Sequence, residues 1–175
     1  MAASTTLVTE LGVRLRDTTN FAYSSAMLTR FLEHAQRLMN YQLGLIRATT
    51  LFTLTAGRTL YQNTAIASNI ARIIMVRDGK RNLFDVPWRS LVHQDPLWYR
   101  RQGKRLETFA RIGNDLVVIA PAMPTAVSVD VVYTTTPAAL TGLAGDVTIP
   151  VEFVPVLTDM AEALALLRGR RFAEA

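Results

Sequence analysis

The 175-residue sequence contains no cysteine. This absence excludes disulfides, thiolate zinc sites, iron–sulfur clusters and cysteine nucleophiles, and it is consistent with synthesis in a reducing cytosol. Only two histidines occur, His34 and His93, and we expect both to be surface or hydrogen-bonded side chains because a histidine-rich metal site needs more ligands. No apolar run approaches the ~20 residues that a membrane span needs. Residues 1–17 lack a charged region followed by an apolar stretch, so no signal peptide is expected.

Sequence signatures of the common enzyme classes are also missing. There is no Gly-x-Ser-x-Gly, no Gly-x-Gly-x-x-Gly and no Asp-x-Asp-x-Asp-Gly loop. The stretch "RDGKRN" (77–82) has a Gly-Lys pair but lacks the other glycine and the Ser/Thr of a phosphate-binding loop. We therefore expect no enzyme, no catalytic residue, no metal and no cofactor. The alternative is a site assembled from scattered residues, which a deep pocket with shifted pKa values would reveal.

The charge that is present is unevenly distributed along the chain. Residues 1–69 have a net charge of +3, residues 70–112 have ten basic and four acidic side chains, and residues 113–175 have a net charge of −4. A basic middle and an acidic C-terminal third allow two interpretations. One is a polyanion-binding face, and the other is a subunit whose basic side meets the acidic side of its neighbour.

Three stretches have helical periodicity. Apolar side chains repeat at i, i+3, i+4 and i+7 over residues 24–46, with Thr29, Gln36 and Asn40 among the residues of the predicted polar face. A shorter helix is predicted over residues 4–16. A third begins near residues 151–154, because Pro155 is tolerated only in a first turn. Gly169 is expected to end this helix, and the tail "RRFAEA" to be frayed.

Between these helices the pattern is that of short strands. We expect hairpins over residues 49–62, around Asp78-Gly79 and around residues 113–115, followed by an alternating strand that ends at Tyr133. His93 is placed in a loop. The predicted fold class is α+β, with a small helical core formed by residues 1–49 and 150–175 and a β-rich insertion at residues 50–149.

The stretch "WYRRQGKRLE" (98–107) concentrates positive charge behind two aromatic rings. Its basic residues are Arg100, Arg101, Lys104 and Arg105. Basic side chains beside stacking aromatics are typical of nucleic-acid surfaces. The other interpretation is a glycine-centred turn with solvated arginines, in which Trp98 packs against the β-rich region. Both interpretations remain open at this point.

Several segments, taken in order over nearly the whole chain, resemble a known family. They are "LVTELGVRLRDTTNFAYSSAMLTRFLEHAQRLM", "TTLFTLTAGRTLYQ", "GNDLVVIAPAMP", "VSVDVVYTTTPAAL" and "IPVEFVPVLTDMAEALALLRGR". Together they resemble the head-to-tail adaptor (connector) proteins of podoviruses, that is, of short-tailed, T7-like and related bacteriophages. One departure is that no proline follows Tyr61 closely.

The resemblance implies a structural virion protein in the neck between capsid and tail, made in the host cytoplasm. Copies would assemble with one another into a ring, usually a dodecamer, beneath the portal protein. The ring would extend the channel for genomic DNA without reading its sequence, and would present a platform to a tail or nozzle protein, with no role for a membrane. The C-terminal segment would dock on the portal, which gives Arg168, Arg170, Arg171 and Phe172 an interface role. The four basic residues of the 98–107 stretch would meet acidic groups of a tail protein or a neighbouring subunit.

Two other functions remain alternatives. One is a different neck or tail-completion protein of a phage. The other is a basic nucleic-acid-binding module, whose affinity would fall steeply with salt.

Overall fold

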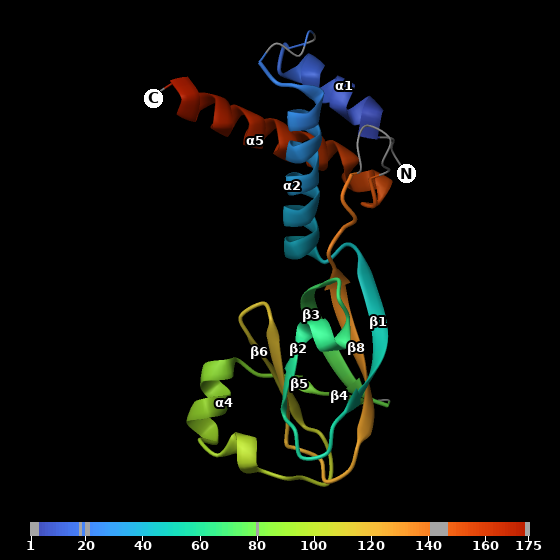
Figure 1. Cartoon of the computed structure of the whole chain (residues 1–175), viewed down its shortest axis with the longest axis vertical. Helices are drawn as coiled ribbons and strands as arrows, with labels where there is room; N and C mark the ends of the chain where they lie inside the picture. Colours follow the sequence, from blue (N-terminus) through green and yellow to red (C-terminus); the bar gives the residue numbers. More distant parts are fainter. Residues whose placement is uncertain (1–3, 18, 20–21, 80, 141–146, 174–175) are drawn as a thin grey trace. The chain divides into compact units, whose positions relative to one another are not determined.

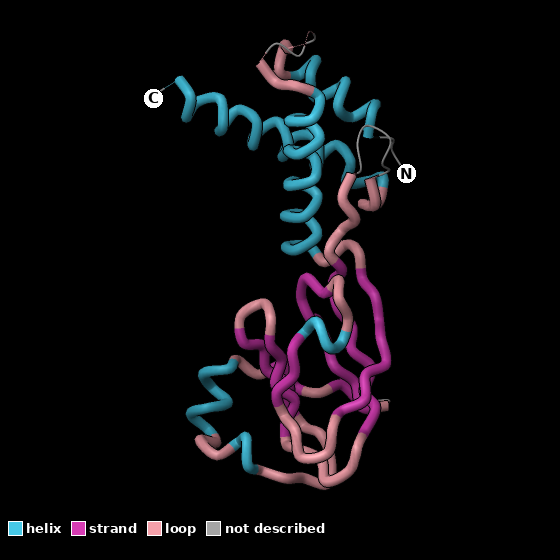
Figure 2. Tube along the Cα trace, viewed as in Figure 1, coloured by secondary structure: helices cyan, strands magenta, loops and turns pink. Residues whose placement is uncertain are grey.

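The computed structural model describes residues 4–17, 19, 22–79, 81–140 and 147–173 (Figure 1). The chain divides into two compact units. The helical unit comprises residues 1–46 and 136–175, and the β unit comprises residues 47–135. Figure 2 shows that one unit is built mainly from helices and the other mainly from strands. The predicted α+β class is confirmed.

The described residues of the helical unit form three α-helices, α1 (Ser4–Arg14), α2 (Ser25–Leu43) and α5 (Val154–Ala173), and the 3-10 turn η3 (Val151–Phe153) precedes α5. Helix α2 begins after Ser24, whose side chain accepts a hydrogen bond from the Met27 amide, and it ends at Gly44 in a left-handed conformation. Helix α5 has Pro155 in its first turn, as the sequence predicted. All three predicted helices are confirmed.

The core of the helical unit lies where these helices meet. Leu11 of α1, Leu32 of α2 and Leu157 of α5 are completely buried in it. Leu140, Val147 and Ile149 pack into the same core. The sequence prediction assigned residues 136–149 to the β-rich insertion, whereas the described part of this segment belongs to the helical unit, because its apolar side chains complete that core.

The predicted polar face of α2 is wrong at three positions. Thr29, Gln36 and Asn40 are buried. Gln36 Nε2 donates to Thr148 Oγ1 at 2.9 Å, and Asn40 Oδ1 accepts from the Ile46 amide at 2.7 Å. Thr29 Oγ1 donates to the carbonyl of Ser25 one turn earlier. Each side chain has a hydrogen-bond partner, which reduces the cost of its burial, although Gln36 Oε1 is buried without a partner among the described residues.

Gly169 does not end α5, which continues as helix to Ala173. A Cβ atom at Gly169 would lie 2.6 Å from the hydroxyl oxygen of Tyr23. That hydroxyl donates to the carbonyl of Ala165 at 3.2 Å. The glycine therefore makes room for a tyrosine that packs against the helix backbone, which is a tertiary role that the local pattern did not indicate.

Two four-stranded sheets form the β unit. The first, in spatial order, contains β1 (Arg47–Leu54), β8 (Val127–Thr135), β3 (Ile70–Asp78) and β4 (Arg81–Asn82), all antiparallel. The second contains β2 (Leu60–Gln62), β7 (Leu116–Ala120), β6 (Thr108–Ile112) and β5 (Phe84–Asp85), with β5 parallel to β6. Three short helical segments complete the unit: α3 (Asn63–Ile66), α4 (Trp88–Gln94) and η1 (Trp98–Arg100).

Two of the three predicted hairpins are confirmed. Strands β3 and β4 pair across a turn that contains Gly79, and β6 pairs with β7 across a turn that contains Gly113; both glycines have positive φ. The predicted hairpin over residues 49–62 is wrong, because β1 pairs with β8 and β2 pairs with β7. The turn at residues 55–59 instead carries the chain from one sheet to the other.

The two sheets pack face to face. Val76, Val129 and Val131 of the first sheet meet Phe109 and Val117 of the second in a buried core. The other face of the second sheet presents small and apolar residues to α4 and η1, which cover it; this second cluster contains Trp88, Leu91, Trp98, Ala110, Val118 and Ala120. His93 lies in the last turn of α4 rather than in the predicted loop.

Candidate functional site

The basic stretch of residues 98–107 contains η1 and leads into β6. Backbone hydrogen bonds hold it against the segment that follows β7. The carbonyl of Arg101 accepts from the Ala122 amide at 3.0 Å, and the Gly103 amide donates to the Ala122 carbonyl at 3.0 Å. A Cβ atom at Gly103 would lie 2.3 Å from Pro121 Cγ, so only glycine fits this close approach. The segment therefore presents its charged side chains from a defined backbone path.

All four basic side chains of this stretch are exposed, but they have different neighbours. The Arg100 guanidinium lies 5.4 Å from the centre of the Tyr99 ring. Arg101 is 3.8 Å from the carboxylate of Asp95. Within the described residues, Lys104 and Arg105 have no acidic partner. The stretch is therefore a series of separate exposed charges rather than one compact cluster.

The aromatic residues of the stretch do not form a platform for bases. The Trp98 ring packs edge-on against Trp88, with 5.1 Å between centroids, over Ala110 and Val118 of the second sheet. This packing agrees with the interpretation in which Trp98 belongs to the β core. Tyr99 is half-exposed, with Arg100 over its ring. Stacking on nucleic-acid bases needs free ring faces, so the geometry favours a surface for protein contacts.

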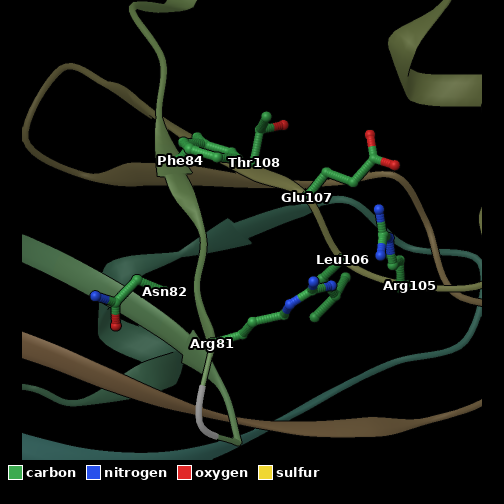
Figure 3. A pocket seen from close by; sticks show the side chains of 7 residues that line it. All are labelled: Arg81, Asn82, Phe84, Arg105, Leu106, Glu107 and Thr108. Atoms are coloured by element: carbon green, nitrogen blue, oxygen red, sulfur yellow. The ribbon is translucent and has the colours of Figure 1, made fainter.

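Arg105 also lines a groove of about 420 Å³ that the sequence analysis missed (Figure 3). The other lining residues come from two segments of the chain, and they are Arg81, Asn82, Phe84, Leu106, Glu107 and Thr108. Figure 3 shows the side chains of Arg81 and Arg105 beside Leu106, with Phe84 next to Thr108. One signal in the sequence was available: Leu83 and Phe84 are consecutive in a strand region, so only one of them can face the core.

The C-terminal candidates lie on α5. Arg168 is exposed on this helix. The backbone of Arg170, Arg171 and Phe172 continues the helix, and their side chains lie outside the described residues. The proposed docking role of these four residues therefore stays a prediction.

Groups that would support other functions are dispersed. His34 is exposed on α2, and His93 is exposed at the end of α4. Among the described residues, no three acidic or histidine side chains lie close enough together to hold a metal ion. Burial raises the pKa of the Tyr61 hydroxyl, but this residue lies inside the core of the β unit and not in the groove.

In the part of the chain that the structure describes, none of the helices combines the length and the apolar composition that crossing a membrane requires.

Comparison with known proteins gives one clear match. The family model of the SU10 adaptor protein matches residues 3–174, which is almost the entire chain. No curated protein matches the sequence. The match confirms the predicted resemblance at the level of a phage adaptor, and the closer relation to T7-like podoviruses stays a prediction. The chain therefore belongs to the SU10 adaptor protein family, a family of structural bacteriophage proteins.

Proposed function

We propose that this protein is a head-to-tail adaptor that assembles into a ring beneath the portal. In this proposal the ring, usually a dodecamer in proteins of this type, extends the channel through which the genome passes. Its other side forms the platform for the tail. The proposal builds on membership of the SU10 adaptor family and on surface features of the two units.

The observation that carries the proposal is the second apolar face of α5. One face of this helix, with Leu157, Ala161 and Ala165, is completely buried in the core of the helical unit. On the remaining surface, Leu166 and Leu167 are 50% and 59% exposed. A surface helix normally turns a polar face to water, and exposed apolar patches mark contact sites. We infer that this face packs against a neighbouring subunit or the portal.

Charge distribution supports the same assembly. The β unit contains twelve basic and six acidic residues, whereas the helical unit contains seven basic and eight acidic residues. A ring is made by head-to-tail contacts, in which each interface joins two different surfaces. The net charge of +6 on the β unit, against −1 on the helical unit, disfavours contacts between two copies of the same basic surface and so favours pairing of different surfaces. The exposed arginines of residues 98–107 belong to the basic unit and are proposed to face a tail protein or the next subunit.

Negative-stain electron microscopy of the protein, alone and mixed with its portal, tests the proposal. Rings with a central hole, or added density beneath the portal, are expected. Replacement of both Leu166 and Leu167 by glutamate should abolish the assembly, because four exposed and apolar methyl groups become two charges. His34→Glu combined with Gln42→Glu is the matched control, since it places two glutamates on exposed positions of α2. A wild-type protein that stays monomeric and leaves the portal unchanged would refute the proposal.

A further inference from the structure

The groove beside Arg105 lies where the two sheets of the β unit separate. Phe84 pairs with Thr108 in the second sheet, and its amide donates to the Glu107 carbonyl at 3.0 Å. Just before this pair, residues 81–82 belong to the first sheet as β4. The groove of about 420 Å³ opens between the two diverging segments. It thus lies at the junction of the sheets, and Arg105, Leu106 and Glu107 of its lining belong to the segment that leads into β6.

Two guanidinium groups of this groove have no acidic partner. Arg81 and Arg105 are exposed, and no ion pair or hydrogen bond of either side chain is found within the described part of the chain. Two other arginines of the β unit do have acidic partners: Arg111 is paired with Asp85 at 2.5 Å, and Arg101 lies 3.8 Å from the Asp95 carboxylate. The groove therefore offers uncompensated positive charge where a carboxylate can accept hydrogen bonds from both sides.

The groove also has an apolar component. Phe84 is 74% exposed, the highest value among the large apolar side chains of the β unit that the structure describes. Leu106, which is only 4% exposed, forms part of the lining next to it. An exposed ring beside a buried leucine creates a site where an aliphatic or aromatic side chain loses contact with water on binding.

Backbone groups are available at the same place. Strand β4 is at the edge of the first sheet. The Leu83 amide donates to the Val76 carbonyl, which continues the ladder of β3 and β4. Because residues of an antiparallel strand face their partner alternately, the amide and carbonyl of Asn82 point away from β3. An open edge of this kind can pair with an added extended segment.

We propose that this groove binds an extended acidic segment of another virion protein, with an apolar side chain of that segment on Phe84 and Leu106. Its carboxylates would bind Arg81 and Arg105, and its backbone would pair with Asn82. This inference rests on the proposed adaptor function for the identity of the partner. A polypeptide fits better than nucleic acid, because the Asn82 edge matches a peptide backbone and because Phe84 and Leu106 offer an apolar contact to an aliphatic side chain.

Chemical-shift titration of the isotope-labelled full chain tests the site directly. The probe is the acetylated and amidated peptide EDLDEID, which combines five carboxylates with two apolar side chains. We expect saturable shifts that centre on the amides of residues 81–84 and 105–108. The peptide EDSDESD, which keeps the charge but loses the apolar side chains, should bind at least about fivefold more weakly. The reversed-charge peptide KKLKKIK should not shift these amides.

Variants separate the contributions of charge and apolar contact. Arg81→Glu combined with Arg105→Glu should weaken EDLDEID binding by about tenfold or more. Arg89→Glu changes an arginine that is also exposed but lies on α4 outside the groove, and it should change EDLDEID binding less than about twofold. Phe84→Ser should weaken EDLDEID binding and leave the weaker EDSDESD binding unchanged. The milder Arg81→Gln and Arg105→Gln changes give the same test if the reversed charges disturb the fold.

Three results would overturn the proposal. They are the absence of saturable shifts at millimolar EDLDEID, shifts centred outside the groove, and tighter binding of a thymidine oligonucleotide than of EDLDEID at the same amides. The titration needs neither the portal nor a ring. Loss of peptide binding with normal rings would refute the groove proposal alone, whereas missing rings with intact peptide binding would refute the adaptor proposal.

Discussion

The hydroxyl group of Tyr61 gives the sharpest stability prediction. Tyr61 is 2% exposed in the core of the β unit. Its hydroxyl oxygen accepts from the Thr55 amide at 3.1 Å and lies 2.9 Å and 3.3 Å from the carbonyls of Arg58 and Thr55, to which it can donate. These contacts fix the turn that carries the chain from the first sheet to the second. Tyr61→Phe removes them and leaves the ring.

The size of the effect follows from what remains after the change. A buried polar group left without a partner costs about 1–3 kcal/mol. Thr55 and Arg58 are exposed, so water can reach their backbone groups and replace part of the lost bonding. We therefore expect the low end of the range, a loss of about 1–1.5 kcal/mol in the free energy of unfolding of the β unit.

Urea unfolding followed by tryptophan fluorescence measures this loss. Both tryptophans, Trp88 and Trp98, lie in the β unit and pack on its second sheet, so the signal reports that unit. Tyr99→Phe is the control, because it removes the same atom from a half-exposed residue and should change the unfolding free energy by less than about 0.5 kcal/mol. Equal midpoints for Tyr61→Phe and Tyr99→Phe would show that the turn does not depend on the hydroxyl.

Other changes test the helical unit and the pH response. Gly169→Ala brings a methyl group to 2.6 Å from the Tyr23 hydroxyl oxygen, so the ring must move and lose its hydrogen bond to the Ala165 carbonyl. This loss of about 0.5–1.5 kcal/mol offsets the gain of about 0.5–1 kcal/mol from alanine in a helix, and the thermal midpoint measured by circular dichroism should not rise. Gly12→Ala has room in α1 and should instead stabilise that unit by about 0.5–1 kcal/mol; a loss would contradict the packing. Asp17→Ala removes an acceptor for the Tyr23 amide at 2.7 Å and for the preceding amide, and should cost about 1–3 kcal/mol in the same assay. Burial raises the pKa of the Tyr61 hydroxyl above its ordinary value of 10.0. As the pH rises, Tyr61 therefore loses its proton in the unfolded chain at a lower pH than in the folded protein, so the free energy of unfolding should fall above about pH 10. Tyr61→Phe should flatten the dependence of the urea midpoint on pH over that range.

The features predicted correctly from the sequence are those that depend on residues close together in the chain. Turns at Gly79 and Gly113 were found because positive φ favours glycine between two apolar runs. The long helix was found from its period, and the structure shows that Ser24 caps it. Errors arose where the outcome depends on distant partners. The residues of β1 and β2 resemble a hairpin locally, yet each of these strands pairs with a strand from much later in the chain.

The candidate site shows the same limit. Arg105 was singled out because it lies in a run of basic residues, and it is exposed as expected. Arg81 was not singled out, because it lies far from Arg105 in the sequence and no local pattern links the two residues. Only the parallel pairing of Phe84 with Thr108 brings their segments together. A parallel pair needs a long connection, here α4 and η1, and no local pattern specifies which two strands such a connection joins.

The β unit begins and ends within one strand pair. Arg47, its first residue, is the partner of Thr134, next to its last, in the ladder of β1 and β8. Paired residues lie about 5 Å apart, so the chain enters and leaves this unit at adjacent points, and no sheet is shared with the helical unit. The two junctions therefore define a cassette. Exchange of residues 47–135 between members of the family would replace the whole basic surface and the groove at once. In the proposed adaptor, tail specificity would then evolve separately from ring formation.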